Sequence, residues 1–338
     1  MKQSRLLKCQ KKMSIYTLIA ILLLTGQVVI AQNTPKIDKI FEKKLQYGMI
    51  SKGNNFPDFY PKNDSIDFLL FTLHEELPLQ DFANKTGFSN EKVNTLTSFL
   101  ENKGWIHKVN ELYKPTVFVA DLNAGQDLYR YAEPISDDIS KEIKDCLPEI
   151  KKEFTRMDIA KKQSFDDWSF FILSNVLLDS WQIDSVENGY LKMTSRPSRH
   201  GKNYFYTIWE HDQSQQVEPF GIYGNQMMNI DNRLICVYGN NRFGYKLLDR
   251  SPIISKEDSE IFNAIAGIFL PKLLKVLDKH NAYSIGVYEK MGYHNEITFE
   301  EFFIWWYHFI YTQVTNMLSN ESIIRIPQGG NFQYELEQ

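Results

Sequence analysis

The chain has 338 residues, with 38 basic and 42 acidic side chains and a formal net charge of −4. Aromatic residues make up 14% of it and no low-complexity tract occurs, so the composition is that of a folded protein and excludes a disordered chain. The length allows one large domain or two modest ones.

The first 31 residues have the pattern of a secretory signal peptide. A basic segment without acidic residues comes first, formed by Lys2, Arg5, Lys8, Lys11 and Lys12. An uncharged run, Ile15 to Ile30, follows, and Val29-Ile30-Ala31 is a small-residue cleavage site. We therefore expect cleavage after Ala31 and a periplasmic or secreted protein without a membrane anchor. Because about 18 apolar residues can span a bilayer, an uncleaved anchor is the alternative.

Removal of the signal changes the charge and the cysteine content. Five of the 38 basic residues leave with it, so 33 basic and 42 acidic side chains remain, a formal charge of −9. An acidic surface repels nucleic acids and acidic lipids. Only Cys146 and Cys236 remain; they can form one disulfide but do not make a disulfide scaffold.

Residues 32–63 are expected to be a lead-in and a linker. Lys36 to Met49 can hold a short helix, and the stretch from Lys52, with Pro57 and Pro61, is typical of irregular structure. We expect the first folded domain to begin after residue 63.

Residues 64–121 contain three short helices followed by strands. Asp64 or Ser65 can cap the first helix, which Pro78 ends, and the second covers Leu79 to Lys85. Ser89 caps the third. We expect two strands, His107 to Tyr113 and Thr116 to Ala120, to form a wing around Lys114-Pro115.

This segment resembles the winged helix-turn-helix domains. The resemblance rests on Leu79-Gln80-Asp81-Phe82-Ala83, on Thr86-Gly87 and on Leu100 to Ile106, and it covers residues 64–121 only; the rest of the chain resembles no family. In that family the third helix enters the DNA major groove and the wing touches phosphates. Here the third helix has no arginine, and its two lysines are matched by two glutamates. We therefore expect a scaffold for a protein contact rather than a DNA reader.

Residues 135–338 are expected to form a larger α+β domain. Asp137 to Phe154 is an amphipathic helix that Pro148 kinks, and Ser164 with Asp167 is a capping box that begins another helix. Trp181 to Val186 and Tyr190 to Thr194 are expected strands around the turn signal Asn188-Gly189.

The rest of this domain is expected to contain further strands, followed by helices. Strands are expected at Tyr204 to Glu210, Gly221 to Tyr223 and Arg233 to Tyr238, and their short connections favour an antiparallel meander. Ser255 and Thr298 can each cap a helix. The helix after Thr298 is apolar on nearly every side, which indicates a buried helix with His308 as a core histidine. The fold class is α+β, with a winged-helix-like N-terminal domain before a helix-plus-antiparallel-sheet domain.

The densest polar chemistry lies at the strand Tyr204 to Glu210 and the loop before it. The candidate ligand-binding residues are Arg196, Arg199, His200, Tyr206, Glu210 and His211. Guanidinium groups suit planar anions such as carboxylate or phosphate, and His211 between acidic residues could transfer protons. The alternative is a hairpin whose arginines pair with the protein's own excess acids.

Motifs for metals, cofactors and nucleophiles are missing from the sequence. It contains no H-E-x-x-H, C-x-x-C, G-x-S-x-G, Walker or dinucleotide pattern. We therefore expect no metal site and no cofactor, and no motif supports an enzyme.

The leading hypothesis is an exported binding or protein-interaction module whose partner is a protein or an anionic small ligand. One alternative is an envelope hydrolase that uses residues 196–211. Another is a membrane-linked DNA-binding regulator, which requires residues 64–121 to face the cytoplasm, against the charge asymmetry of the N-terminus.

Overall fold

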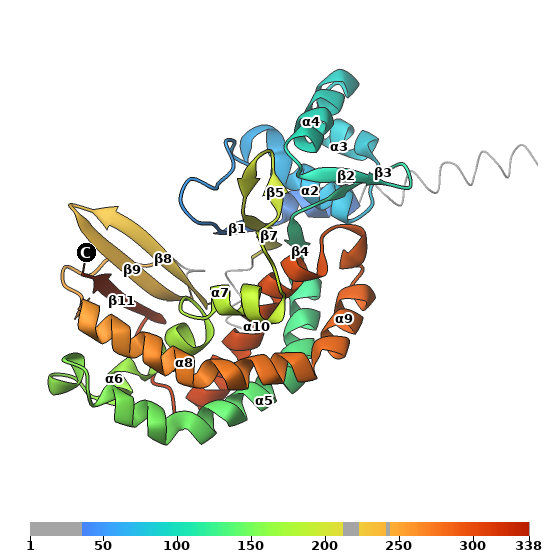
Figure 1. Cartoon of the computed structure of the whole chain (residues 1–338). Coiled ribbons are helices and arrows are strands. Elements are labelled where there is room, and N and C mark those ends of the chain that lie inside the picture. Colours follow the sequence, from blue (N-terminus) through green and yellow to red (C-terminus); the bar gives the residue numbers. More distant parts are fainter. Residues whose placement is uncertain (1–35, 212–222, 241–243, 338) are drawn as a thin grey trace, which may run out of the picture. The chain divides into compact units, whose positions relative to one another are not determined.

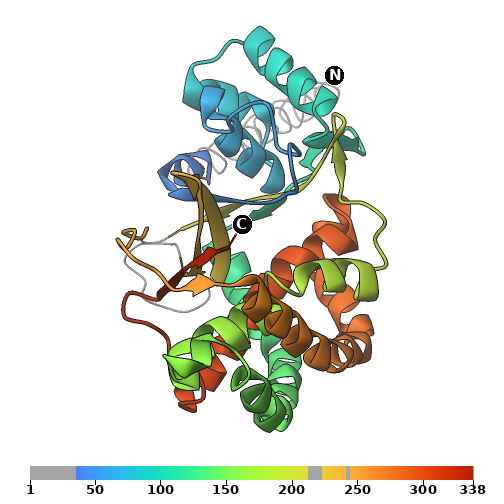
Figure 2. The same ribbon diagram turned by 60° about the vertical axis from the view of Figure 1, so that its left-hand side comes forward.

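A computed structural model describes residues 36–211, 223–240 and 244–337 (Figures 1 and 2). The expected signal peptide and the start of the expected strand Gly221 to Tyr223 lie outside these residues. The fold is α+β, as the sequence predicted, with about 55% helix and 18% strand. The described residues divide into two compact units, of which the first comprises residues 36–43 and Asp58–Pro115 and the second Lys44–Pro57 and the described part of residues 116–337.

The first unit is mainly helical. Its elements after a helix at residues 36–42 are α2 (Ile66–His74), α3 (Leu79–Thr86), α4 (Asn90–Asn102), β2 (Ile106–Val109) and β3 (Leu112–Pro115). Gly87 ends α3 in the left-handed conformation, and the Ser89 hydroxyl accepts a hydrogen bond from the Lys92 N–H to cap α4. Phe82, Leu100 and Trp105 are fully buried and form the centre of this unit.

The expected strand pairing of the wing is wrong. Strands β2 and β3 pair antiparallel around Asn110 and Glu111, which have φ values of 47° and 67°. Asn tolerates this left-handed conformation, so the turn forms there and not at Lys114-Pro115. Strand β4 (Phe118–Ala120) instead belongs to a sheet of the second unit, where its apolar side chains are buried.

The second unit contains two main sheets. The first has the order β1 (Leu45–Ile50), β7 (Phe205–Glu210), β4, with β1 antiparallel and β4 parallel to β7. The expected helix Lys36 to Met49 therefore stops at residue 42, because the chain continues as an edge strand. Two short strands, β5 (Ser198–Arg199) and β6 (Lys202–Asn203), form a separate hairpin.

The second main sheet combines strands from the middle of the unit with the C-terminal strand. Its order is β10 (Ile253–Ile254), β11 (Asn331–Leu336), β9 (Arg233–Asn240), β8 (Tyr223–Ile230). Figure 2 shows the C-terminal strand β11 beside β9, to which it is antiparallel. The expected single meander is thus limited to the hairpin β8–β9, and β7 pairs in the other sheet.

Long helices build most of the second unit (Figure 1). They are α5 (Leu122–Phe154), α8 (Lys256–Lys279), α9 (Asn281–Lys290) and α10 (Phe299–Asn320). Ser255 and Thr298 cap α8 and α10 as expected, and α5 continues through Pro134 and Pro148. Nearly all of α10 is buried, so its apolar faces pack against α5 and the sheet, and His308 is a core residue.

A continuous run of helical turns replaces the expected hairpin around Asn188-Gly189. The capping box of Ser164 and Asp167 begins α6 (Phe165–Phe170), as predicted. The chain continues as a π-helix, Phe171–Val176, then as α7 (Ile183–Ser185) and a second π-helix, Val186–Tyr190. A Cβ atom at Gly189 would lie 3.0 Å from Leu274, so the missing side chain lets this turn pack closely on α8. Packing, rather than the turn signal, decides the local structure.

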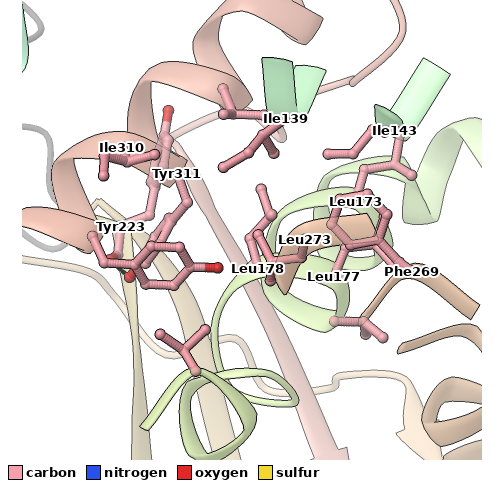
Figure 3. Close-up of a cluster of buried hydrophobic side chains, with 14 of the residues drawn as sticks. Ile139, Ile143, Leu173, Leu177, Leu178, Tyr223, Phe269, Leu273, Ile310 and Tyr311 are labelled. Atoms are coloured by element: carbon pink, nitrogen blue, oxygen red, sulfur yellow. Dashed lines mark hydrogen bonds between the residues drawn. The ribbon is translucent and has the colours of Figure 1, made fainter. Parts of the chain in front are cut away.

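The core of the second unit lies between these helices and the four-stranded sheet (Figure 3). Leu173, Leu177 and Leu178 from the turns meet Ile139 of α5 and Leu273 of α8. Tyr223 and Tyr311 lie at the sheet side of this cluster, where the Tyr311 hydroxyl donates to the Tyr223 carbonyl at 2.6 Å. Cys146 and Cys236 are both buried and free.

Candidate functional site

A pocket of about 240 Å³ lies in the second unit, and it contains one of the six candidate residues, Arg196. Its walls come from the chain after β1, the turns of α7 and the following π-helix, the loop before β5, and β6. The lining residues are Lys52, Asn55, Asp184, Glu187, Asn188, Met193, Thr194, Ser195, Arg196 and Asn203. Only amide, hydroxyl and charged side chains and one methionine face the space.

Arg196 is held rigidly at the wall of this pocket. Its Nε and Nη2 donate to the Glu187 carboxylate over 2.7 to 3.1 Å, and Nη2 also lies 3.3 Å from Asp184. The guanidinium lies over the Phe205 ring, 5.6 Å from its centre. Its exposure is only 8%, and its Nη1 has no hydrogen-bond partner within the described residues. Arg196 is therefore a fixed cation in the pocket wall, and its remaining donor, Nη1, is itself shielded from solvent.

The rim of the pocket carries an exposed ion pair. Lys52 Nζ lies 2.5 Å from Asp184 Oδ2, with side-chain exposures of 65% and 49%. Exposed pairs of this kind contribute about 0 to 1 kcal/mol, since water screens them. A ligand with matching charges can therefore replace the partner of each side chain at small cost.

Asparagine side chains join the segments of the pocket. Asn55 Oδ1 accepts from the Asn203 N–H at 3.2 Å, and Asn203 Nδ2 donates to the Arg196 carbonyl at 2.9 Å. Lys202 Nζ reaches the Asn54 carbonyl at 2.9 Å. These bonds hold together stretches of chain that are far apart in the sequence.

Arg199, the second candidate arginine, does not line the pocket. Its Nη2 donates to the Glu301 carboxylate at 2.7 and 2.8 Å and to the Thr116 carbonyl, and its Nη1 donates to the Tyr204 carbonyl at 2.6 Å. Both charged groups are only 2% exposed. Burial raises the pKa of Glu301, while Arg199 opposes this effect. This ion pair joins β5 to the start of α10 and leaves little of the guanidinium for a ligand.

The other four candidate residues occupy separate positions. His200 is exposed in the turn of the β5–β6 hairpin, and Tyr206 is buried in β7. Glu210 Oε2 accepts from the Leu122 N–H at the start of α5, at 3.1 Å. His211 is buried, and its backbone N–H donates to the Lys44 carbonyl at 2.7 Å. The structure therefore does not gather the six residues at the pocket.

Asp179 is a notable buried group that the sequence analysis did not select. It is 6% exposed, its Oδ2 has no hydrogen-bond partner in the described ranges, and burial raises its pKa to about 7. Burial raises the pKa values of Tyr238, Tyr307 and Tyr311, and the nearby Asp179 carboxylate raises them further. The sequence signal that could have indicated Asp179 is its position as a single acidic residue within the mainly apolar stretch Leu177 to Trp181.

Within residues 36–211, 223–240 and 244–337, no group of three metal-ligating side chains occurs. No helix there is both long and apolar enough to cross a membrane. No protein-family model, curated protein or solved structure matches the chain.

Proposed function

We propose that the protein is an exported binding module and that the pocket beside Arg196 holds a small zwitterionic ligand, such as a free α-amino acid. The observation that carries the proposal is the exposed Lys52–Asp184 ion pair at the rim of this pocket, beside an Arg196 guanidinium that holds Asp184 and Glu187 in place. Export is proposed from the sequence of residues 1–31.

The charges of the pocket favour a ligand with both signs. The positive charges of Lys52 and Arg196 equal the negative charges of Asp184 and Glu187 in number. The pocket therefore has no net positive charge to attract a simple anion. A zwitterion can place its carboxylate on Lys52 and its ammonium on Asp184, in exchange for their exposed ion pair. The volume corresponds to about eight water molecules at roughly 30 Å³ each, which suits a single small molecule.

The pocket offers weak support for hydrolysis. No histidine or cysteine lines it, so Ser195 and Thr194 have no imidazole base beside them. We therefore favour binding over the envelope hydrolase.

In this proposal the first unit supplies a protein contact. The two lysines at either end of α4 already pair with acids of the same unit, Lys92 with Asp64 at 2.9 Å and Lys103 with Asp58 at 2.6 Å. These pairs leave less positive charge for phosphates and support a protein partner over DNA.

The test is calorimetric titration of the mature protein with each of the 20 standard L-α-amino acids. We expect at least one to bind, and Asp184→Asn to weaken it at least tenfold, because the ammonium loses its carboxylate. Asp137→Asn, an exposed change on α5, is the matched control. The proposal fails if no amino acid binds, or if Asp184→Asn binds like the control.

A further inference from the structure

Asp179 stands at the start of the turns that carry two carboxylates of the pocket. Its carbonyl accepts from the N–H groups of Gln182 and Ile183 at 2.7 and 2.8 Å. The next turn follows at once, since the Val186 N–H donates to the Gln182 carbonyl at 2.9 Å. Asp184 and Glu187 lie on these turns, so the backbone at Asp179 helps to set their position.

The carboxyl of Asp179 lies near three buried tyrosines. Tyr307 and Tyr311 of α10 and Tyr238 of β9 are close enough for its charge to act on their hydroxyls. The Tyr311 hydroxyl is the only group that opposes the effect of burial on the Asp179 pKa, so no basic side chain of the described chain compensates the charge. The Tyr307 hydroxyl, like Asp179 Oδ2, has no hydrogen-bond partner within the described residues.

The helix that leads into Asp179 has π geometry, Phe171–Val176. π-helical segments are rare in proteins, but those that do occur often lie at functional sites. Two buried side chains of this segment make hydrogen bonds. Ser174 bonds Tyr238 and lies 2.6 Å from Thr315, and Asn175 Oδ1 accepts from the Ser180 N–H at 3.3 Å. These bonds tie the π segment to β9, to α10 and to Ser180, the residue that follows Asp179.

We propose that Asp179 controls the pocket: when its carboxyl is protonated, residues 180–190 keep their turns, and when it ionises, this segment opens and the pocket loses affinity. The driving force is the cost of an unpaired charge in the core, which local opening relieves by admitting water. The effect on affinity rests on the proposed function, whereas the opening of the segment does not.

The direction and size of the effect follow from the protonation equilibrium. The pKa of Asp179 is about 7 in the closed state, against 3.8 for a solvated aspartate. Opening therefore becomes more favourable by up to about tenfold for each pH unit between these values. Between pH 5 and pH 8 the expected increase in the opening constant is at least tenfold, with an upper limit near 100-fold.

Hydrogen–deuterium exchange of the full mature chain tests the opening without any ligand. After correction for the intrinsic exchange rate, protection of the amides of 180–190 should fall at least tenfold from pH 5 to pH 8. Asp179→Asn should remove this fall, whereas the exposed control Asp137→Asn should keep it. The inference is overturned if wild-type protection in this segment does not fall with pH, a result that needs no variant to fold.

Titration with glycine, the smallest zwitterion, tests the coupling to the pocket. We expect glycine to bind the wild type at least tenfold more weakly at pH 8 than at pH 5, and Asp179→Asn to bind equally at both. Equal binding by the wild type at both pH values, together with pH-dependent exchange, overturns the coupling. If glycine binds at neither pH, the same comparison is made with an amino acid that binds in the titration above; the proposed ligand class fails if none of them binds, and hydrogen exchange then still decides whether Asp179 controls the segment.

Discussion

Burial of the Asp179 carboxyl makes the stability of the protein depend on pH. Its folded-state pKa of about 7 lies above the value of a solvated aspartate, so the folded state binds the proton more tightly than the unfolded state. The stabilisation of the folded state by this bound proton is complete below about pH 4 and is lost as the pH rises through about 7. One pKa unit corresponds to about 1.4 kcal/mol, so this loss is a few kcal/mol of the free energy of unfolding.

Asp179→Asn should therefore stabilise the protein at neutral pH. An amide of the same shape carries no charge at any pH, so the thermal midpoint of the variant should exceed that of the wild type at pH 8 and approach it at pH 4. The measurement is thermal unfolding across this range, with Asp137→Asn as control. A variant less stable than the wild type at pH 8 would show that the charge is compensated.

The buried pair of Arg199 and Glu301 predicts a different response. Glu301→Gln leaves a guanidinium without its countercharge in the core, so we expect a loss of about 3 to 5 kcal/mol in the free energy of unfolding. His200→Ala, next to Arg199 but exposed, should change it by about 0.5 kcal/mol or less. Denaturant titration measures both, and equal effects would contradict the structural role of the pair.

At the scale of elements, one glycine allows β9 and β11 to pair closely. Gly239 has φ 152°, and a Cβ atom there would collide with the Gly330 carbonyl oxygen and with Asn331. These are backbone and adjacent side-chain atoms that cannot move without separating the strands. The close approach therefore needs a residue without a side chain.

Gly239→Ala should destabilise the four-stranded sheet by about 2 to 4 kcal/mol, because strain and overpacking add. The matched control is Gly224→Ala, directly opposite in β8, where an added Cβ meets nothing within 4 Å. The control should be neutral or slightly stabilising. Chemical unfolding of both variants checks this, and similar midpoints would refute the close contact.

Helix α4 should not function as a DNA recognition helix. Its lysines are matched by Glu91 and Glu101 within the helix and capping turn, and Lys92 pairs with Asp64 of the same unit. We expect no binding to labelled duplex tighter than about 10⁻⁴ M at physiological salt. Micromolar affinity that falls steeply with added salt would contradict this expectation.

At the scale of the whole molecule, the N-terminal sequence predicts export. The mature protein should begin at Gln32 and carry a formal charge of −9, because the basic n-region is removed. N-terminal sequencing of the protein from the periplasm or medium is the measurement. Recovery of a soluble cytoplasmic form that retains Met1 would refute cleavage.

Local patterns in the sequence were enough for the α+β class and for several helix boundaries. Ser89, Ser164, Ser255 and Thr298 each cap the helix that they were expected to cap, since a cap depends on atoms within one turn of chain. The burial of α10 and His308 also followed from composition, because a helix that is apolar on nearly every side must pack in a core.

Tertiary structure alone decided the strand partners and the site. Asn188-Gly189 is part of a π-helix packed on Leu274 rather than the predicted hairpin turn. Phe118–Ala120 pairs with β7, although the sequence predicted a local hairpin. Arg196 and Arg199 have similar sequence surroundings, yet one binds Glu187 beside a pocket and the other binds Glu301, 102 positions away. Pairing, burial and the pKa of Asp179 depend on groups that are distant in sequence, and no local pattern specifies which of them will meet.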